Sequence, residues 1–217
     1  MGRSEVMGCR QATRFGRSIA AALAFVALCC SVSASAGVMD PEPGDMALGS
    51  AKARVTVIEY ASVGCPHCAD WRHDVFPTLK TRYIDTGRMR FVVREMITGD
   101  PTIATAGFML ARCAGPEKYF QVVDDVYARQ PQMWGKAANA GAVLGEIAKA
   151  AGMTEDAYEA CIDDQKGLDA LNARVAQHNK DGIGSTPTFF VDGKRYDEPL
   201  TLAQVAAAFK PGRRPQG

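Results

Sequence analysis

The 217-residue sequence lacks several features that would assign it to common functional classes. It has no excess of basic residues of the kind that binds nucleic acid, because 25 basic residues oppose 24 acidic ones. Its longest apolar run, from Ile19 to Cys30, falls well short of the roughly 20 residues that a membrane-spanning helix needs. Internal repeats and low-complexity segments are also absent. Nucleic-acid binding, a repeat architecture and stable membrane insertion are therefore not expected.

The first 36 residues have the pattern of a secretory signal peptide. Four arginines precede the apolar run, and Ala34-Ser35-Ala36 offers a small-residue cleavage site. We expect cleavage after Ala36 and a mature protein in the periplasm. Without the leader, 21 basic and 23 acidic residues remain, and the cysteines that remain are Cys65, Cys68, Cys113 and Cys161. An even number of cysteines in an exported protein indicates two pairs.

The order of the expected elements is typical of a small α/β unit interrupted by helices. After an irregular lead-in over residues 37–50, we expect strands over 54–60 and 90–96, joined by a helix that begins at residue 65, kinks at Pro77 and ends near Gly87. A right-handed crossover makes these strands parallel neighbours. A late hairpin over 188–196 joins the same sheet, and a helix over 202–209 closes the unit. The helices expected in between cover 103–114, 117–129 (before a break at Pro131), 142–151, 155–163 and 167–180.

The most specific motif is Cys65-Pro66-His67-Cys68, at the start of the first helix. Two thiols at this spacing can exchange electrons as a dithiol/disulfide pair. Free backbone N–H groups at the helix start favour the thiolate of Cys65, whereas Cys68 lies one turn inward and is expected to be the buried, resolving thiol. A thiolate of low pKa is also a good leaving group, which favours passing the disulfide to a substrate.

Other uses of this motif fit the sequence less well. A structural disulfide and half of a zinc site are the alternatives, but only three histidines are available and no second Cys-x-x-Cys exists. Ala69 follows the motif, so it is not a haem attachment site either. We therefore expect no metal and no cofactor besides the redox-active Cys65/Cys68 pair.

The motif, its strand-to-helix setting, the helical insertion and the segment Ser185 to Phe189 together resemble the DsbA family of thioredoxin-fold proteins. The resemblance covers essentially the whole mature chain and is most specific over 55–68 and 184–193. It implies an α/β thioredoxin fold with an all-helical insertion, in which residues 37–97 and 184–217 form the discontinuous thioredoxin-like domain and 98–183 the insertion. It also implies that Thr186-Pro187 is a cis peptide bond beside the cysteines, and that Glu59 is a buried acid beneath the disulfide.

Five further residues are expected to assist the cysteine pair. His67 adds a donor or a positive charge near the Cys65 sulfur, unless it is only a solvated residue of the helix start. A buried Glu59 would move a proton to or from Cys68, but strand alternation leaves its burial open, because apolar residues occupy both faces of the strand. Pro66, Thr186 and Pro187 are the expected substrate contacts, since a cis proline leaves neighbouring backbone free to pair with a peptide. Otherwise Pro187 only breaks a loop.

Cys113 and Cys161 lie on two of the expected insertion helices. We interpret them as a structural disulfide, in preference to a second redox site. The bridge would close a loop of roughly 50 residues, worth about 4 kcal/mol in the chain-entropy model.

The sequence thus predicts a periplasmic thiol:disulfide oxidoreductase that introduces disulfide bonds into reduced, exported polypeptides, with a membrane-bound redox partner that re-oxidises it. A disulfide isomerase or reductase of the same fold remains an alternative, because threonine at position 186 is also found in such proteins whereas the oxidase pattern has an apolar residue. A non-catalytic peptide-binding or chaperone module is the alternative from a different class.

Overall fold

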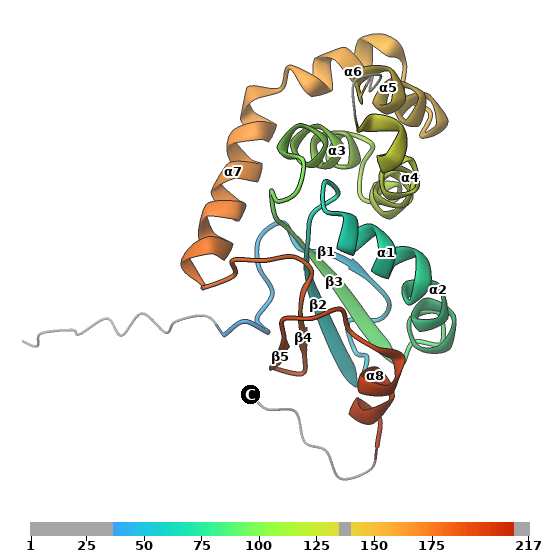
Figure 1. Ribbon diagram of the computed structural model, residues 1–217, viewed down its shortest axis with the longest axis vertical. Coiled ribbons are helices and arrows are strands. Elements are labelled where there is room, and N and C mark those ends of the chain that lie inside the picture. Colours follow the sequence, from blue (N-terminus) through green and yellow to red (C-terminus); the bar gives the residue numbers. More distant parts are fainter. Residues whose placement is uncertain (1–36, 135–139, 211–217) are drawn as a thin grey trace, which may run out of the picture. The chain divides into compact units, whose positions relative to one another are not determined.

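The computed structural model describes residues 37–134 and 140–210 of the chain (Figure 1). The expected signal peptide and its cleavage after Ala36 therefore lie outside the described residues. Within the described part, no helix is both long enough and apolar enough to cross a lipid bilayer.

A five-stranded mixed sheet forms the base of the fold, in the order β1-β3-β2-β4-β5. The central strand β2 runs parallel to β3, as the sequence predicts, and the late hairpin joins the same sheet through β4, which pairs antiparallel with β2. Strands β2 and β3 are buried almost throughout, because helices and loops cover both faces of a parallel pair. The bounds are β1 (Met46–Leu48), β2 (Val55–Ala61), β3 (Met89–Glu95), β4 (Thr188–Val191) and β5 (Lys194–Tyr196).

The helix that follows β2 is interrupted where Pro77 predicts a kink. Helix α1 (Pro66–Asp74) ends at Val75, α2 (Phe76–Leu79) begins with Pro77 in its first turn, and a π-helical turn (Lys80–Ile84) completes the segment. Gly87 then adopts a φ of 71°, the left-handed conformation expected there. The reactive helix is thus a short, separately terminated unit.

The helices inserted between β3 and β4 share one hydrophobic core with the sheet. They lie above the sheet in Figure 1, and their apolar side chains join those of β2, β3 and α1 in a single cluster. Helix α8 closes the thioredoxin-like part. The bounds are α3 (Pro101–Cys113), α4 (Tyr119–Met133), α5 (Ala140–Ala150), α6 (Glu155–Ile162), α7 (Gln165–Lys180) and α8 (Leu202–Ala208).

Two details of the sequence prediction are wrong. The lead-in is not wholly irregular, because Met46–Leu48 form the strand β1 along the outer edge of β3. Helix α4 does not break at Pro131 but continues to Met133. Pro131 lies in the last turn of α4, where it removes one intrahelical hydrogen bond without stopping the chain from completing that turn.

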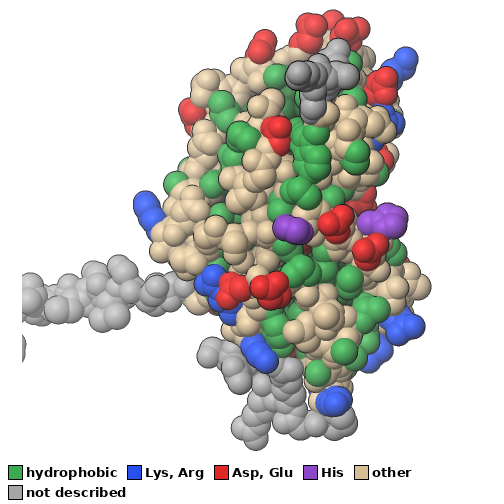
Figure 2. All heavy atoms as spheres, in the orientation of Figure 1, with side chains coloured by type: hydrophobic (Ala, Val, Ile, Leu, Met, Phe, Trp, Pro, Cys, Tyr) green, Lys and Arg blue, Asp and Glu red, His purple; other side chains and the backbone are tan. Residues whose placement is uncertain are grey.

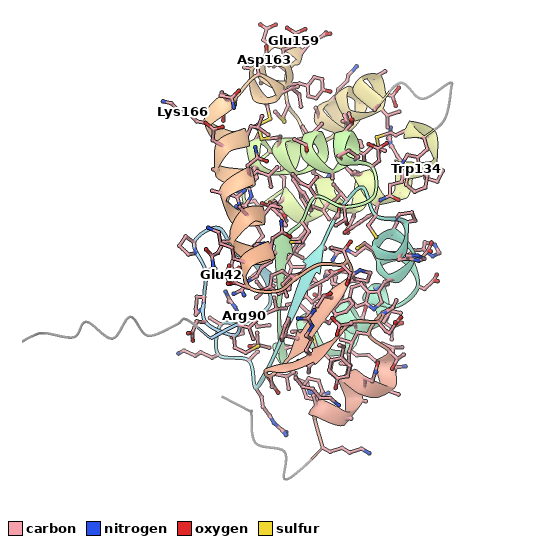
Figure 3. The ribbon with its side chains drawn as sticks, turned by 60° about the vertical axis from the view of Figure 1, so that its left-hand side comes forward. Glu42, Arg90, Trp134, Glu159, Asp163 and Lys166 are labelled. Atoms are coloured by element: carbon pink, nitrogen blue, oxygen red, sulfur yellow. A yellow bond between two sulfur atoms is a disulfide. The ribbon has the colours of Figure 1, made fainter. Side chains whose placement is uncertain are left out.

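Ionic contacts hold the segment before β1 against the rest of the fold. The guanidinium of Arg94, on β3, donates to Asp45 at 2.9 Å and also pairs with Glu42. Glu42, which Figure 3 shows beside α7, lies 3.1 Å from Nε2 of His178 on that helix, although the two residues are 136 positions apart. The N-terminal segment therefore joins the sheet to the last helix of the insertion.

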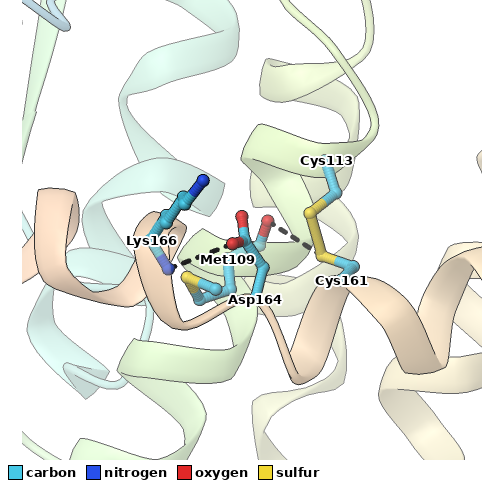
Figure 4. The surroundings of a disulfide bond; sticks show 5 residues. All are labelled: Met109, Cys113, Cys161, Asp164 and Lys166. Atoms are coloured by element: carbon cyan, nitrogen blue, oxygen red, sulfur yellow. Dashed lines mark hydrogen bonds between the residues drawn. A yellow bond between two sulfur atoms is a disulfide. The ribbon is translucent and has the colours of Figure 1, made fainter.

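Cys113 and Cys161 form a disulfide bond, as predicted, between the ends of α3 and α6 (Figure 4). Their Cα atoms lie 6.0 Å apart, and the bridge spans 48 positions of the sequence. It ties the first inserted helix to the fourth.

Candidate active site

Cys65 lies at the N-cap of α1, directly after the loop that leaves the buried strand β2. Pro66 occupies the first helical position, where its missing N–H costs nothing. The side chain of Cys65 is 6% exposed and that of Cys68 is fully buried, and both cysteines carry free thiols. The structure therefore shows the reduced pair in the arrangement that the motif predicts.

Hydrogen bonds lower the pKa of Cys65 from 9.0 to about 5. The largest cause is the hydrogen bond from the Cys68 thiol, and burial opposes it. The side chain of Thr186 and the backbone N–H groups of His67 and Cys68 lower the pKa further. At neutral pH, Cys65 is thus a stable thiolate and a good leaving group.

Thr186 contacts the reactive sulfur through two of its atoms. Its backbone carbonyl accepts from the Cys65 thiol at 3.4 Å when that thiol is protonated. Its hydroxyl oxygen lies 2.5 Å from the hydroxyl oxygen of Thr98. When Thr98 donates in this pair, the Thr186 hydroxyl proton is free to point to a Cys65 thiolate. Sequence reasoning missed Thr98, which orients Thr186 toward the sulfur.

Close backbone contact brings the loop after β3 against the loop after β2. A Cβ atom on Gly64 would lie 2.2 Å from the carbonyl oxygen of Asp100, and one on Gly99 would lie 2.1 Å from that of Gly64. Gly99 also has a positive φ of 71°. Only glycine fits at either position, and this approach places Thr98 beside the cysteine loop.

Glu59 is buried on β2, with 1% of its surface exposed, so the structure resolves the question that strand alternation leaves open. Burial raises its pKa from 4.5 to about 8, and the positive charge of Arg72 opposes this shift. One carboxyl oxygen has no hydrogen-bond partner among the described residues. Burial also raises the pKa of Cys68 well above its usual value, and the charge of Glu59 adds to that rise. A protonated Glu59 therefore accompanies a protonated Cys68 at neutral pH.

An ion pair between a buried arginine and an exposed aspartate lies next to this carboxyl group. The Arg72 side chain is 5% exposed, and its Nε donates to Asp124 of α4 at 2.5 Å. Its guanidinium carbon lies 3.5 Å above the ring of Phe76. The hydroxyl group of Tyr127 lacks a hydrogen-bond partner among the described residues. Neither Arg72 nor Asp124 has a sequence signal, because α4 contributes to the site only after the insertion folds onto α1.

The remaining candidate residues occupy the places that the sequence suggests, with one qualification for His67. His67 and Pro66 are exposed beside Cys65, and Thr186-Pro187 is a cis peptide bond. The backbone N–H of His67 contributes to the lowered pKa of Cys65, and the role of its imidazole stays a prediction. The described residues contain no group of three or more His, Cys, Asp and Glu side chains arranged to hold a metal ion.

Comparison with known proteins finds similar sequences and similar folds. Residues 41–210 match the family model described as thioredoxin. The chain is 30% identical to the crystal structure of Wolbachia pipientis alpha-DsbA1, covering 78% of this chain and 90% of that one, with a TM-score of 0.69. BdbD from Bacillus subtilis, at 21% identity, shares the fold with a TM-score of 0.66 over 76% of this chain and 90% of BdbD.

A curated protein of Rickettsia bellii is 32% identical over 169 residues, and it is named provisionally as a protein-disulfide oxidoreductase. The match covers 77% of this chain but 64% of the Rickettsia protein. The chain thus spans less than two thirds of the length of this relative.

Proposed function

The chain belongs to the thioredoxin family, among its DsbA-like members, and from this premise we propose that it is a thiol:disulfide oxidoreductase that introduces disulfide bonds into exported polypeptides. The observation that carries this proposal is the opposite shift of the two thiol pKa values. The pKa of Cys65 is lowered to about 5, while the pKa of Cys68 is raised well above 9.0. A stabilised thiolate favours the dithiol form over the disulfide form, so the disulfide form readily oxidises the thiols of a substrate.

The reaction begins with the oxidised Cys65–Cys68 pair. A substrate thiolate attacks the Cys65 sulfur, the S–S bond breaks, and Cys68 leaves and takes up a proton. Glu59, which is protonated at neutral pH, supplies that proton and is re-protonated from solvent. The half-buried Thr186 and the cis Pro187 adjoin the sulfur that carries the substrate, and so hold the substrate backbone there.

A second substrate thiolate then attacks the substrate sulfur of the mixed disulfide. Cys65 leaves as a thiolate, which its hydrogen bonds stabilise. The substrate loses two electrons and two protons in total, and the cysteine pair gains the two electrons. A membrane-bound protein that carries a disulfide would re-oxidise the pair. This cycle, and the leader pattern of residues 1–36, support a periplasmic location.

Direct trapping tests the assigned roles. Cys68→Ser leaves an attacking thiol that cannot be resolved, so mixed disulfides with exported proteins should accumulate on Cys65. Mass spectrometry of the variant from secreting cells identifies the trapped partners. Cys65→Ser is the matched control and should carry none. Recovery of Cys68→Ser free of covalent partners would argue against the proposal.

The equilibrium of the cysteine pair with glutathione tests the direction of electron flow. An oxidase should hold the dithiol form strongly, and its disulfide should be reduced by a small excess of reduced glutathione. A pair that stays oxidised under these conditions would point to a reductase. Efficient repair of scrambled disulfides, with slow oxidation of dithiols, would point to an isomerase.

A further inference from the structure

Each cause that lowers the pKa of Cys65 is a hydrogen bond, from Cys68, from Thr186 or from the backbone at the start of α1. On the face shown in Figure 2, histidine side chains lie among acidic and apolar ones, with Lys and Arg side chains nearer the edges. The reactivity of this thiol therefore depends on hydrogen-bond geometry, and thus on the residues that hold the donors in place.

Ser62 lies directly after β2, in the turn that leads to Cys65, and it is fully buried. Its carbonyl oxygen accepts from the N–H of Cys65 at 3.0 Å, which closes the turn. Burial raises the pKa of Cys68, and a hydrogen bond from the backbone N–H of Ser62 opposes that rise. The backbone of Ser62 thus contacts both reactive cysteines.

The hydroxyl group of Ser62 uses its full hydrogen-bonding capacity. It donates to the carbonyl oxygen of Thr98 at 2.8 Å, and it accepts from the N–H groups of Gly64 at 3.2 Å and of Thr98 at 3.3 Å. A hydroxyl group has one proton and two lone pairs, so all three are occupied. A serine that only stabilises its own turn bonds to groups a few positions away, whereas two of these bonds reach a residue 36 positions away.

These two bonds orient Thr98. Because the Ser62 hydroxyl bonds to both the N–H and the carbonyl group of Thr98, it fixes the backbone from which the Thr98 side chain projects. The oxygen of that side chain lies 2.5 Å from the hydroxyl oxygen of Thr186, the residue that adds to the effect of Cys68 on the pKa of Cys65. A chain of hydrogen bonds therefore connects Ser62 to the reactive sulfur across the loops that follow β2 and β3 and the loop before β4.

We propose that Ser62 is a positioning residue for disulfide exchange, whose hydroxyl holds Thr98, and through it Thr186, in the place from which the Cys65 thiolate is stabilised. The same turn keeps the N–H of Ser62 directed at Cys68, where it stabilises that sulfur when Cys68 leaves. A substrate does not touch Ser62, because the residue is fully buried. The inference rests on the proposed function, since it assigns a residue to that reaction.

Removal of this hydroxyl tests the proposal. Ser62→Ala takes the acceptor away from the N–H groups of Gly64 and Thr98, so Thr98 should turn away from Thr186 and the pKa of Cys65 should rise by about one pH unit. The equilibrium constant for reduction of the protein disulfide by glutathione should then fall about tenfold at pH 7, because the thiolate of the dithiol form is less stable. Thiolate absorbance at 240 nm and the glutathione equilibrium measure these two quantities.

Ser50→Ala is the matched control. The Ser50 hydroxyl also accepts from the N–H two positions later, that of Lys52 at 3.1 Å, but Ser50 is exposed and lies between β1 and β2. This variant should keep the wild-type pKa of Cys65 and the wild-type glutathione equilibrium. If Ser62→Ala unfolds at a lower urea concentration but keeps both wild-type quantities, Ser62 has only a structural role and the proposal is wrong.

A double variant tests the route through Thr98. If Ser62 acts through Thr98, then Ser62→Ala combined with Thr98→Val should raise the pKa of Cys65 no further than Ser62→Ala alone. Rises that add would show that Ser62 acts on Cys65 by another route, and would overturn the proposal. If Ser62→Ala does not fold, Ser62→Gly removes the same hydroxyl, leaves room for a water molecule to bond to both N–H groups, and carries the same tests.

Dithiothreitol oxidation separates this inference from the proposed function. If the wild-type disulfide does not oxidise dithiothreitol, the proposed function fails, while the pKa of Cys65 in Ser62→Ala still tests the hydrogen-bond chain. If dithiothreitol is oxidised but Ser62→Ala keeps the wild-type pKa and glutathione equilibrium, only the role of Ser62 is wrong.

Discussion

The two cysteine pairs of the described chain differ in what surrounds their sulfur atoms. The Cys65 sulfur faces hydrogen-bond donors from Cys68, Thr186 and the start of α1. A backbone carbonyl oxygen lies 3.4 Å from the sulfur at both sites, that of Thr186 beside Cys65 and that of Met109 beside Cys161 (Figure 4), so the sites differ in the donors that face Cys65. Hydrogen-bond donors stabilise a thiolate, whereas a carbonyl oxygen does not. The first site is therefore suited to releasing a thiolate and the second to keeping its disulfide.

Removal of the second pair should have the largest effect on stability. Cys113→Ala with Cys161→Ala frees a loop of 48 positions in the unfolded chain and should lower the free energy of unfolding by about 4 kcal/mol. The rate of thiol exchange per folded molecule should stay the same. Urea melts and dithiol oxidation at 25 °C measure the two effects. Loss of thiol exchange at unchanged stability would show that this pair has a redox role, and the distinction between a redox-active pair and a structural pair would then be wrong.

For the Cys65/Cys68 pair, in contrast, loss of the disulfide by reduction should raise the stability of the fold. Its reduced form should be more stable than its disulfide form by about 2 kcal/mol at pH 7, because the Cys65 thiolate is stabilised in the folded protein. Because the folded pKa of about 5 lies below the unfolded value of 9.0, this stability is complete above pH 9 and fades as the pH falls through 5. Thermal melts of both forms across pH decide this. A disulfide form that melts higher at pH 7 would indicate a reductant.

Glu59→Gln should separate proton transfer from folding. At pH 7 the variant should reduce substrate oxidation about tenfold, because Cys68 loses its proton donor. The wild-type fold should lose stability as the pH rises from 4.5 towards 8, since the folded state holds a proton that the unfolded state has released. The variant should lack this loss. Stopped-flow oxidation and urea melts at several pH values test both, and an unchanged rate with an unchanged pH profile would remove Glu59 from the mechanism.

Thr98→Val should produce the smallest change. It keeps the shape of the side chain but removes the hydroxyl that orients Thr186. The pKa of Cys65 should rise by about half a unit to one unit, the effect of weakening one hydrogen bond. Thiolate absorbance at 240 nm against pH measures it. Thr102→Val, on the exposed first turn of α3, is the control, and an equal shift in both variants would deny Thr98 a specific role.

The sequence predicts the local parts of this molecule well. Strands β2 and β3, the helix start at Cys65, the interruption near Pro77 and the left-handed Gly87 each follow from residues close together in the chain. Strand β1 is not predicted, because its three residues lie among prolines and glycines and are too few to show a strand periodicity. They form a strand because they pair with the edge of β3. Pro131 is a local signal that its position in the last turn overrides.

The site is less predictable, because much of it comes from distant segments. Arg72 and Asp124 meet only when α4 packs on α1, and no local pattern marks either. Thr98 could have been found by topology. It follows β3 as Cys65 follows β2, and the carboxyl ends of neighbouring parallel strands meet at one edge of a sheet.

The long sequence separations in this fold have a consequence for a chain that emerges N-terminus first. The cysteine helix is made early, but Thr186 lies 121 positions after Cys65, and the Leu200 partner of Trp71 lies 129 positions after it. Strand β2 likewise cannot form backbone hydrogen bonds along its second edge until β4 has been synthesised. Until those residues arrive, Cys65 lacks one of the groups that lower its pKa and behaves more like an ordinary thiol. The full reactivity of Cys65 therefore arises only after Thr186 has been synthesised and has folded against it.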